Sequence, residues 1–458
     1  MSTLNKINAD GGKYRWTICG LLFFATTVNY LDRAVLSLLK PELSGTFGWT
    51  ETDYGNISAC FTLVYAISMV FAGRIIDKLG TKLGFHIAIA LWSVGAIIHA
   101  YSVPMGEWAH NALALIGITV FPITVLGFMI ARAVLAVGEA GNFPAAIKTT
   151  AEYFPKKERS FATGIFNSGA NVGAVLAPLS VPWLAANWGW QSAFMLVGAI
   201  GFIWMIFWQI FYEQPDKQKR LSKEELAYIR NNPDEIVSDE STEVKTSWFK
   251  LLQYRQTWAF AFGKFMTDGV WWFYLFWLPA YLASNYQVTG TALTWPLAVL
   301  YTIAMAGSII GGAFPKYFMN KGYTAYDGRM RAMLVIALFP LIVLLAQPMG
   351  HAGFWAPILL IGIGAAAHQA WSANIFTTVS DMFPKKAVAS AVGIGGMAGG
   401  IGGFIINKSA GALFDHYKSL DAIYTGYAIM FGFCAVAYLL AWGVMKLLVP
   451  KYKPITDL

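Results

Sequence analysis

The chain contains 458 residues, of which 57% are hydrophobic and 13% are charged. Soluble proteins carry about 25% charged residues, so this composition excludes an ordinary globular protein and indicates a polytopic membrane protein. The net charge of +8 does not indicate a nucleic-acid partner, because Lys and Arg cluster in short connectors between apolar runs. Such clustering is typical of the cytoplasmic side of a lipid bilayer.

Twelve apolar runs are long enough to cross a bilayer, which takes about 20 residues of helix. The connectors after the second, fourth and eighth runs are basic, so we expect both termini to be cytoplasmic. The run over residues 113–126, interrupted at Pro122, predicts an extra kinked or interfacial piece that extends the fourth span on its outer side. The expected spans cover residues 17–40, 54–76, 83–102, 124–147, 158–183, 190–212, 256–284, 291–316, 330–347, 354–379, 387–408 and 422–447.

A charged, polar segment divides the chain. We interpret residues 213–250 as a cytoplasmic linker between an N-terminal six-helix bundle, residues 1–212, and a C-terminal six-helix bundle, residues 251–458. Within the linker, Ser222 precedes Glu225 by three residues, which is the spacing of a capping box. This spacing predicts one short surface helix.

The two halves repeat at an offset of 229 residues, half the length of the chain. The segment EYFPKKERSFATGIFNSGANVGAV, from Glu152, aligns with DMFPKKAVASAVGIGGMAGGIGGF, from Asp381. Identity extends beyond FPKK to Gly164 and Gly173, which keep the register. Paired six-helix halves are typical of secondary transporters, whose substrate sites lie between the halves near the middle of the membrane.

The connector between the second and third spans reads GRIIDKLGTK. It resembles the signature of the major facilitator superfamily, apart from Thr81, where a basic residue is usual. The resemblance implies an all-α membrane protein with twelve transmembrane helices in two pseudo-symmetric six-helix bundles, and a gating role for the connector. A solvated turn that obeys the charge rule is the alternative interpretation. The matching residues are Gly73, Arg74, Asp77, Lys78, Gly80 and Lys82.

Three segments resemble the anion:cation symporter branch of that superfamily: NYLDRAV, RAVLAVGEAGNFPA and EYFPKKERS. KFMTD on the seventh span and AHQAWSANIFTTVSDMF on the tenth resemble the bacterial hexuronate permeases more narrowly. The resemblance implies that the protein imports a sugar acid such as galacturonate or glucuronate by proton symport across a bacterial inner membrane. An aldonate, an aldarate or sialic acid is the alternative cargo within the same branch.

Four ionisable residues of the first and fourth spans fall inside apolar sequence. Arg132 and Glu139 are seven residues apart, close to two helical turns, so both project from one face. Charged side chains inside a membrane normally face the bundle interior or an aqueous path. Arg33 carries a planar fork that matches a carboxylate, so we expect it to hold the anionic substrate, with Asp32 and Glu139 as the proton-coupling pair. The alternative is a static network, Asp32 with Arg132 or Arg33 with Glu139, that only satisfies buried charges.

Other polar and aromatic residues of the spans are candidates for substrate contact. Lys264 and Asp268 are four residues apart, a spacing that suits either an internal ion pair or a lysine that faces the cavity. Tyrosine, histidine and amide groups can bond sugar hydroxyls, and an indole can stack on a pyranose ring. The expected substrate-binding set is Tyr30, Arg33, Tyr65, Arg132, Asn171, Lys264, His368, Gln369, Trp371 and Asn374.

Motifs of several other function classes are missing. The sequence has no G-x-x-x-x-G-K-S/T phosphate loop, HExxH metal site or GxSxG elbow, so neither an ATP-driven pump nor an enzyme is expected. The three cysteines lack metal-ligand spacing, and we expect no metal, no cofactor and no disulfide framework. Because each half supplies the other's interface, we expect the chain to work as a monomer.

Overall fold

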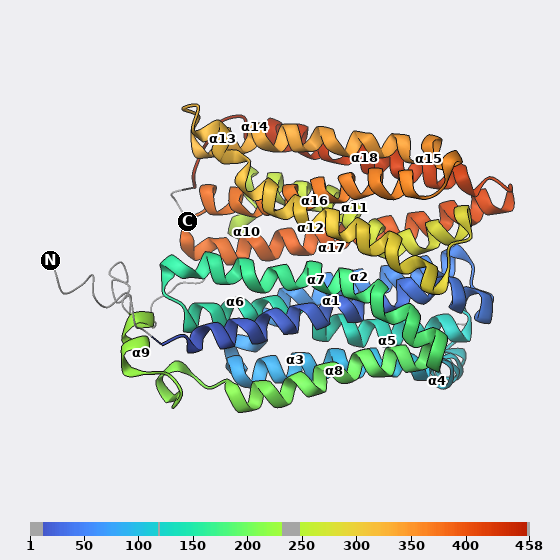
Figure 1. Ribbon diagram of the computed structural model, residues 1–458, viewed down its shortest axis with the longest axis horizontal. Helices are drawn as coiled ribbons and strands as arrows, with labels where there is room; N and C mark the ends of the chain where they lie inside the picture. The colour runs from blue at the N-terminus through green and yellow to red at the C-terminus, as the bar shows by residue number, and fades with distance from the viewer. Residues whose placement is uncertain (1–11, 118–119, 231–247, 456–458) are drawn as a thin grey trace.

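The computed structural model describes residues 12–117, 120–230 and 248–455. Throughout these residues the regular elements are all helical. Figure 1 shows two bundles side by side, the first running from blue to green and the second from yellow to red. Many large hydrophobic side chains are exposed on the helices, as expected where a helix bundle meets lipid.

The first bundle comprises α1 (Tyr14–Phe47), α2 (Glu51–Leu79), α3 (Thr81–Ile98), α4 (Ser102–Ala114), α5 (Ile123–Glu139), α6 (Asn142–Tyr153), α7 (Lys156–Trp188) and α8 (Trp190–Phe211). The second comprises α11 (Arg255–Tyr286), α12 (Thr294–Ala313), α13 (Pro315–Met319), α14 (Ala325–Leu338), α15 (Ala346–Met349), α16 (Trp355–Met382), α17 (Lys385–Ser419) and α18 (Ile423–Leu448). Between the bundles lie α9 (Lys223–Arg230) and α10 (Trp248–Leu251). Short 3-10 turns occur at η1 (His99–Tyr101), η2 (Pro215–Lys217), η3 (Gly290–Leu293), η4 (Phe339–Leu345) and η5 (Gly350–Ala352).

Eleven helical stretches of the described chain are long and apolar enough to cross a membrane. Some of them join consecutive helices, as where α3 continues through η1 into α4 and where α5 is followed by α6. The predicted seventh span is α11, which has 32 residues and lies outside these eleven. This helix is rich in Trp and Tyr, carries Lys264 and Asp268, and buries most of its residues among its neighbours.

The extra piece predicted around Pro122 was wrong for the residues that the structure describes there. α4 ends at Ala114, Gly117 has a φ of 78°, and α5 begins directly after Pro122. The apolar run therefore completes a third span that is longer than predicted and continues into a connector with an exposed Leu115. Hydropathy does not mark this boundary, whereas a left-handed glycine and a proline without an amide donor do.

The sequence repeat corresponds to equivalent helix contacts in the two bundles. A Cβ on Gly173 of α7 would lie 2.4 Å from the carbonyl oxygen of Thr27 in α1. A Cβ on Gly402 of α17 would lie 2.1 Å from the carbonyl oxygen of Phe265 in α11. The repeated glycine thus allows the same close helix approach in each half, which explains why the repeat keeps it.

The predicted linker helix is confirmed as α9, and it contacts the first bundle. The backbone N–H of Glu225 donates to the hydroxyl of Ser222 at 3.1 Å, as the capping-box spacing requires. The Glu225 carboxylate accepts the backbone N–H groups of Tyr14 and Arg15, each at 3.1 Å. A buried carboxylate of the linker therefore caps the first turn of α1.

Candidate functional site

The four predicted intramembrane charges lie together in the interior. Asp32 and Arg33 come from α1, and Arg132 and Glu139 from α5; each is 2% exposed or less. The Arg33 guanidinium contacts the Glu139 carboxylate with Nη2 at 2.6 Å and with Nε at 2.8 Å. Of the two static pairings considered from the sequence, Arg33 with Glu139 is therefore formed in this state.

Aromatic rings from both bundles surround the Arg33 guanidinium. Its central carbon lies 4.7 Å from the ring centre of Tyr30, 5.0 Å from Tyr65 and 5.4 Å from Phe61. Trp272 of α11 completes the set at 5.1 Å, so Arg33 lies where the two bundles meet. Ring faces attract a cation and stabilise the arginine here. The sequence analysis missed Phe61 and Trp272, because an aromatic residue in an apolar span resembles any packing residue.

Arg132 and Asp32 are placed differently from Arg33. The Arg132 guanidinium donates to the backbone carbonyl of Arg33 at 3.2 and 3.3 Å and lies 5.2 Å from the ring centre of Phe61. Both carboxyl oxygens of Asp32 are buried without a hydrogen-bond partner among the described residues. Arg132 therefore joins α5 to α1, and an ionised Asp32 would be a buried charge without hydrogen bonds.

A second intramembrane ion pair lies on α11. Lys264 Nζ contacts Asp268 Oδ2 at 2.7 Å, the internal pairing expected from their spacing. The same ammonium lies 4.3 Å from the ring centre of Phe376 in α16. The Lys264 side chain is 6% exposed and that of Asp268 is 19% exposed, so the carboxylate is the more accessible partner.

Three candidates on α16 are engaged in packing within the second bundle. His368 Nδ1 lies 2.8 Å from the hydroxyl of Tyr438, and its ring stacks on Trp271. Asn374 donates to two backbone carbonyls, one of them on α12. Trp371 is fully buried against Tyr438, so its ring could stack on a sugar only if α16 and α18 separated there.

The remaining substrate candidates lie on several elements. Tyr30 and Tyr65 are partly accessible beside Arg33, and Gln369 on α16 is likewise partly accessible. Asn171 on α7 is 8% exposed and stands two residues before the glycine that packs against α1.

The signature connector between α2 and α3 is built around a glycine turn. Gly80 has a φ of 77°, a conformation that glycine adopts without strain. The departure from the signature, Thr81, donates its hydroxyl proton to Glu152 at 2.6 Å. Lys82 pairs with Glu213 at 2.9 Å, and this hydrogen bond holds the pKa of the Glu213 carboxyl below its ordinary value. These contacts tie the connector to α6 and to the first residue of the linker.

The other signature residues carry less structural information. Arg74 and Lys78 are exposed on α2, and Gly73 faces open space. The side chain of Asp77 lies outside the described part of the chain. The gating role of this connector therefore stays a prediction.

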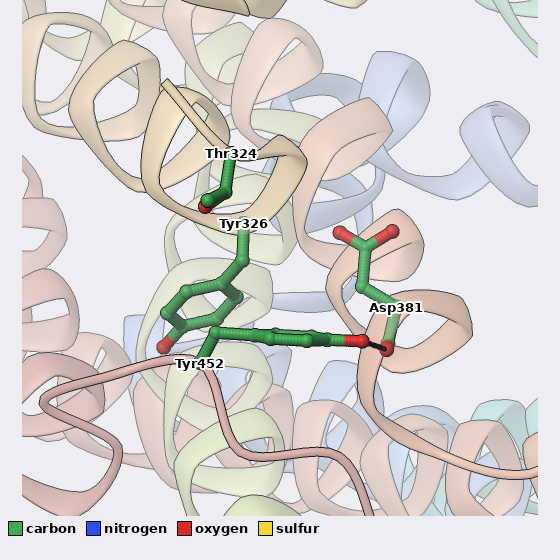
Figure 2. Close-up of a pocket in the computed structure, with 4 residues that line it drawn as sticks. All are labelled: Thr324, Tyr326, Asp381 and Tyr452. Atoms are coloured by element: carbon green, nitrogen blue, oxygen red, sulfur yellow. Dashed lines mark hydrogen bonds between the residues drawn. The ribbon is translucent and has the colours of Figure 1, made fainter. Parts of the chain in front are cut away.

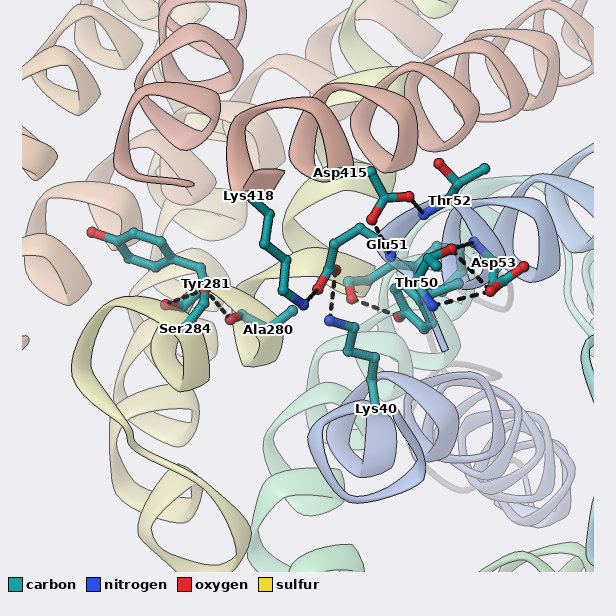
Figure 3. Close-up of polar contacts among 12 residues, drawn as sticks. Lys40, Thr50, Glu51, Thr52, Asp53, Ala280, Tyr281, Ser284, Asp415 and Lys418 are labelled. Atoms are coloured by element: carbon teal, nitrogen blue, oxygen red, sulfur yellow. Dashed lines mark hydrogen bonds and ion pairs between the residues drawn. The ribbon is translucent and has the colours of Figure 1, made fainter. Parts of the chain in front are cut away.

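Charged residues join the two bundles at the end where α1 finishes and α2 begins, as Figure 3 shows. Asp415 of α17 accepts the backbone N–H groups of Glu51 at 2.8 Å and Thr52 at 2.7 Å. The Glu51 carboxylate contacts Lys40 at 2.6 Å within its bundle and Lys418 at 3.3 Å across to the other. We call these five residues the end latch. An anion at a helix N-terminus is favourable, so Asp415 stabilises contact between the bundles.

A pocket on the second bundle lies far along the chain from these residues. Its volume is about 190 Å³, and Thr324, Tyr326, Asp381 and Tyr452 line it (Figure 2). The Asp381 carboxylate is held by Arg329 at 2.9 Å, and the Tyr452 hydroxyl donates to the Asp381 backbone. Two of the four lining residues, Asp381 and Tyr452, are thus already bonded to each other.

Sequence comparison identifies the family. The profile described as Major Facilitator Superfamily matches residues 22–407. The chain belongs to the major facilitator superfamily. The hexuronate transporter of Escherichia coli is 30% identical to it over 433 residues, covering 94% of each chain. The galacturonate transporter of Dickeya chrysanthemi is 29% identical over 353 residues, covering 77% of this chain and 95% of that protein.

A further relative is described as a transporter of a different sugar acid. The D-galactonate transporter of Escherichia coli is 26% identical to this facilitator-superfamily protein over 449 residues, covering 96% of this chain and 98% of that one. These relatives agree with the resemblance to hexuronate permeases drawn from KFMTD and the tenth-span motif.

Solved structures share the fold. A bacterial homologue of the human lysosomal transporter Spinster, in an inward-facing and occupied conformation, matches with a TM-score of 0.70 and 19% identity, covering 96% of this chain and 97% of that one. A D-xylose-proton symporter matches with a TM-score of 0.67 and 16% identity, covering 97% and 99%. The twelve-helix facilitator fold expected from the sequence is confirmed. The protein is accordingly a multi-pass membrane transporter of a bacterial transporter family and not an enzyme.

Proposed function

We propose that this protein imports a hexuronate, galacturonate or glucuronate, together with one or more protons, by alternating access around Arg33. The observation that carries the proposal is the Arg33–Glu139 ion pair, held 2.6 Å apart where the two bundles meet. Relatives described as hexuronate and galacturonate transporters support the choice of cargo.

Competition between the substrate carboxylate and Glu139 for Arg33 couples substrate binding to proton binding. A substrate carboxylate can take the two N–H donors, Nε and Nη2, that now bond Glu139 Oε2, because a carboxylate matches the planar guanidinium group. Glu139 then loses its counter-charge in a buried site, and a proton bound to its carboxyl group removes that cost. Binding of the anion therefore favours binding of the proton, and the reverse.

The charge balance of the central cluster supports the same coupling. The two arginines and two carboxylates would cancel if all four were ionised. A bound monoanion adds one negative charge, and an uncompensated buried charge costs several kcal/mol. Uptake of one proton by Asp32 or Glu139 restores neutrality. Neither oxygen of Asp32 has a hydrogen-bond partner among the described residues, so Asp32 can take that proton without breaking a contact.

Polar groups around Arg33 supply contacts for the sugar hydroxyls in this proposal. Tyr30 and Tyr65 flank the guanidinium and remain partly accessible, and a phenol can both donate and accept. Lys264 and Gln369 on the second bundle and Asn171 on the first are further candidates for these contacts. His368, Trp371 and Asn374 would contribute only after rearrangement of their present packing.

The end latch sets the direction of access in this proposal. It joins the bundles at the end of the molecule opposite the start of α1, so substrate would reach Arg33 from the other end in this state. Alternating access requires the latch to open while the signature-connector end closes. We propose that both termini are cytoplasmic, that the protein lies in a bacterial inner membrane, and that it functions as a monomer.

Transport by purified protein in proteoliposomes tests the proposal. With the outside one pH unit more acidic, we expect saturable accumulation of labelled galacturonate that a protonophore abolishes. Arg33→Ala should abolish this uptake, whereas Arg255→Ala, which removes an exposed arginine at the start of α11, should not. Wild-type uptake by Arg33→Ala would refute the substrate anchor, and equal uptake without a pH gradient would refute proton coupling.

A second candidate cargo follows from the relatives described as transporters of D-galactonate and of galactarate and D-glucarate. An open-chain sugar acid presents the same carboxylate to Arg33. Competition of labelled galacturonate uptake by unlabelled galacturonate, glucuronate, galactonate, glucarate and sialic acid distinguishes the candidates. The best competitor identifies the preferred class of anion.

A further inference from the structure

The two intramembrane ion pairs differ in their access to the space between the bundles. The side chains of Arg33 and Glu139 are 3% and 0% exposed, so their carboxylate is sealed in this state. The Asp268 side chain of the second pair is 19% exposed. A proton from an aqueous path would therefore reach Asp268 more easily than Glu139.

Asp268 faces the first bundle, and its exposure is not a contact with lipid. It shares a face of α11 with Lys264 and Trp272, each four residues away. Trp272 lies over Arg33 of α1, which orients this face toward the site already described. Asp268 also interacts electrostatically with Tyr30 of α1.

The helix that crosses Asp268 leaves room for its carboxyl group at a glycine. A Cβ on Gly399 of α17 would lie 2.2 Å from Asp268 Oδ2. The absence of a side chain at Gly399 thus allows the carboxyl group to lie between α11 and α17. The groups facing the pair are Lys264 on its own helix, Tyr30 on α1, Tyr438 on α18 and, near Lys264, His368 on α16.

We propose that Asp268 is a second proton-binding residue of the transport cycle, and that the substrate anion displaces it from Lys264. The inference rests on the proposed function. Lys264 keeps its ammonium charge throughout: its contact with Asp268 Oδ2 breaks, and it binds an oxygen of the substrate anion instead. Asp268 takes one proton from the aqueous side, so the transporter loaded with one monoanion and two protons carries one net positive charge. Each half of the transporter thus contains one cation that exchanges a carboxylate for substrate.

The decisive measurement is the accumulation ratio, which is the internal concentration of labelled galacturonate divided by the external concentration at equilibrium. This ratio depends on the number of coupled protons and not on the transport rate. With the membrane potential clamped at zero, each coupled proton contributes about tenfold accumulation per unit of pH difference. We expect Asp268→Asn to lower the ratio by about tenfold at one pH unit. Asp268→Glu should retain the wild-type ratio, and so should Glu42→Gln, which removes an exposed carboxylate of α1.

A double variant distinguishes a proton carrier from a static ion pair. If the pair only neutralises itself, Lys264→Gln with Asp268→Asn restores the wild-type ratio, and the inference is overturned. A wild-type ratio in Asp268→Asn alone also overturns it. A ratio that stays low in the double variant while substrate counterflow continues supports it. If the wild-type protein itself shows no dependence on the pH gradient, the proposed function fails, which is visible before any variant is made.

Discussion

At the residue scale, Arg33 illustrates how a permanent charge is accommodated inside a membrane protein. One carboxylate and four aromatic rings surround the guanidinium, so its charge and its π-face are both satisfied without water. In the proposed function the same arrangement leaves the contact exchangeable, because a substrate carboxylate of similar shape replaces Glu139. The site would then stabilise the empty protein and still recognise an anion.

Replacing Arg33 by Lys should keep the positive charge and remove the paired N–H donors of the guanidinium. Lysine offers a point charge in place of two parallel N–H donors, so we expect a loss of about 1.5–3 kcal/mol in substrate recognition, or about 10- to 150-fold in kcat/KM. Initial rates of galacturonate uptake over a range of substrate concentrations measure this change. Arg255→Lys, on an exposed arginine, serves as the control, and unchanged kinetics in Arg33→Lys would contradict bidentate recognition.

Replacing Asp32 by Asn should separate coupling from stability. No hydrogen bond to the Asp32 carboxyl exists among the described residues, so the nearly isosteric amide removes no contact. We expect the thermal unfolding temperature of the purified protein to change little, while accumulation driven by a pH gradient falls. A large drop in that temperature would instead show that the Asp32 carboxylate stabilises the fold through its charge beside Arg132.

At the element scale, helix ends and glycine contacts decide how the bundles fit together. The first turn of α2 is capped by Thr50 from its own chain segment and by Asp415 from the other bundle. The repeated glycines bring α7 against α1 and α17 against α11. In the proposed function the first kind of contact breaks during transport, because alternating access requires the bundles to separate at that end. The second kind is a packed interface within one bundle.

Asp415→Asn should loosen the latch between the bundles. An anion at a helix N-terminus contributes about 0.3–1 kcal/mol, and up to about 2 kcal/mol where it is partly buried, so the closed population at that end should fall several-fold. Distance measurements between spin labels on α2 and α17 report the change. Asp53→Asn is the matched control, because Asp53 caps the same turn from within α2. Equal distance distributions in wild type and Asp415→Asn would contradict the latch.

Gly402→Ala should destabilise the second bundle. The added Cβ would meet the Phe265 carbonyl oxygen at 2.1 Å, and overpacking of this kind costs about 1–3 kcal/mol. Thermal unfolding of the purified protein measures the loss. Gly432→Ala on α18, where nothing lies within 4 Å, should be neutral or slightly stabilising. Equal unfolding temperatures for the two variants would show that α17 and α11 can move apart at little cost.

At the scale of the whole molecule, the charge carried through a cycle follows from the two ion pairs. If Glu139 or Asp32 takes one proton and Asp268 takes another, each imported monoanion moves with two protons, and the cycle carries one net positive charge. An inside-negative potential should therefore drive uptake by about 2.3 kcal/mol per 100 mV, which is about 50-fold in accumulation. Potassium diffusion potentials applied to proteoliposomes measure this effect. Uptake by Asp268→Asn should not respond to the potential. A full response in that variant would contradict a stoichiometry of two protons per monoanion.

Much of this protein was determined by its sequence alone. Composition and apolar runs predict the helical membrane fold, because a bilayer leaves few other structures possible. The offset between Glu152 and Asp381 predicts the paired bundles, and charges such as Arg33 and Glu139 stand out against apolar surroundings. Each of these signals is local, or repeats along the chain.

Only the tertiary structure decided which of these residues meet. Arg33 pairs with Glu139, while Asp32 has no hydrogen bond within the described part of the chain, although both acids were equal candidates in the sequence. Trp272 reaches Arg33 from the other bundle, and Asp415 caps α2 from a segment more than 360 residues away. The physical reason is that helix periodicity fixes the face on which a side chain lies but not the helix that packs against it. That choice depends on the packing of all the helices together.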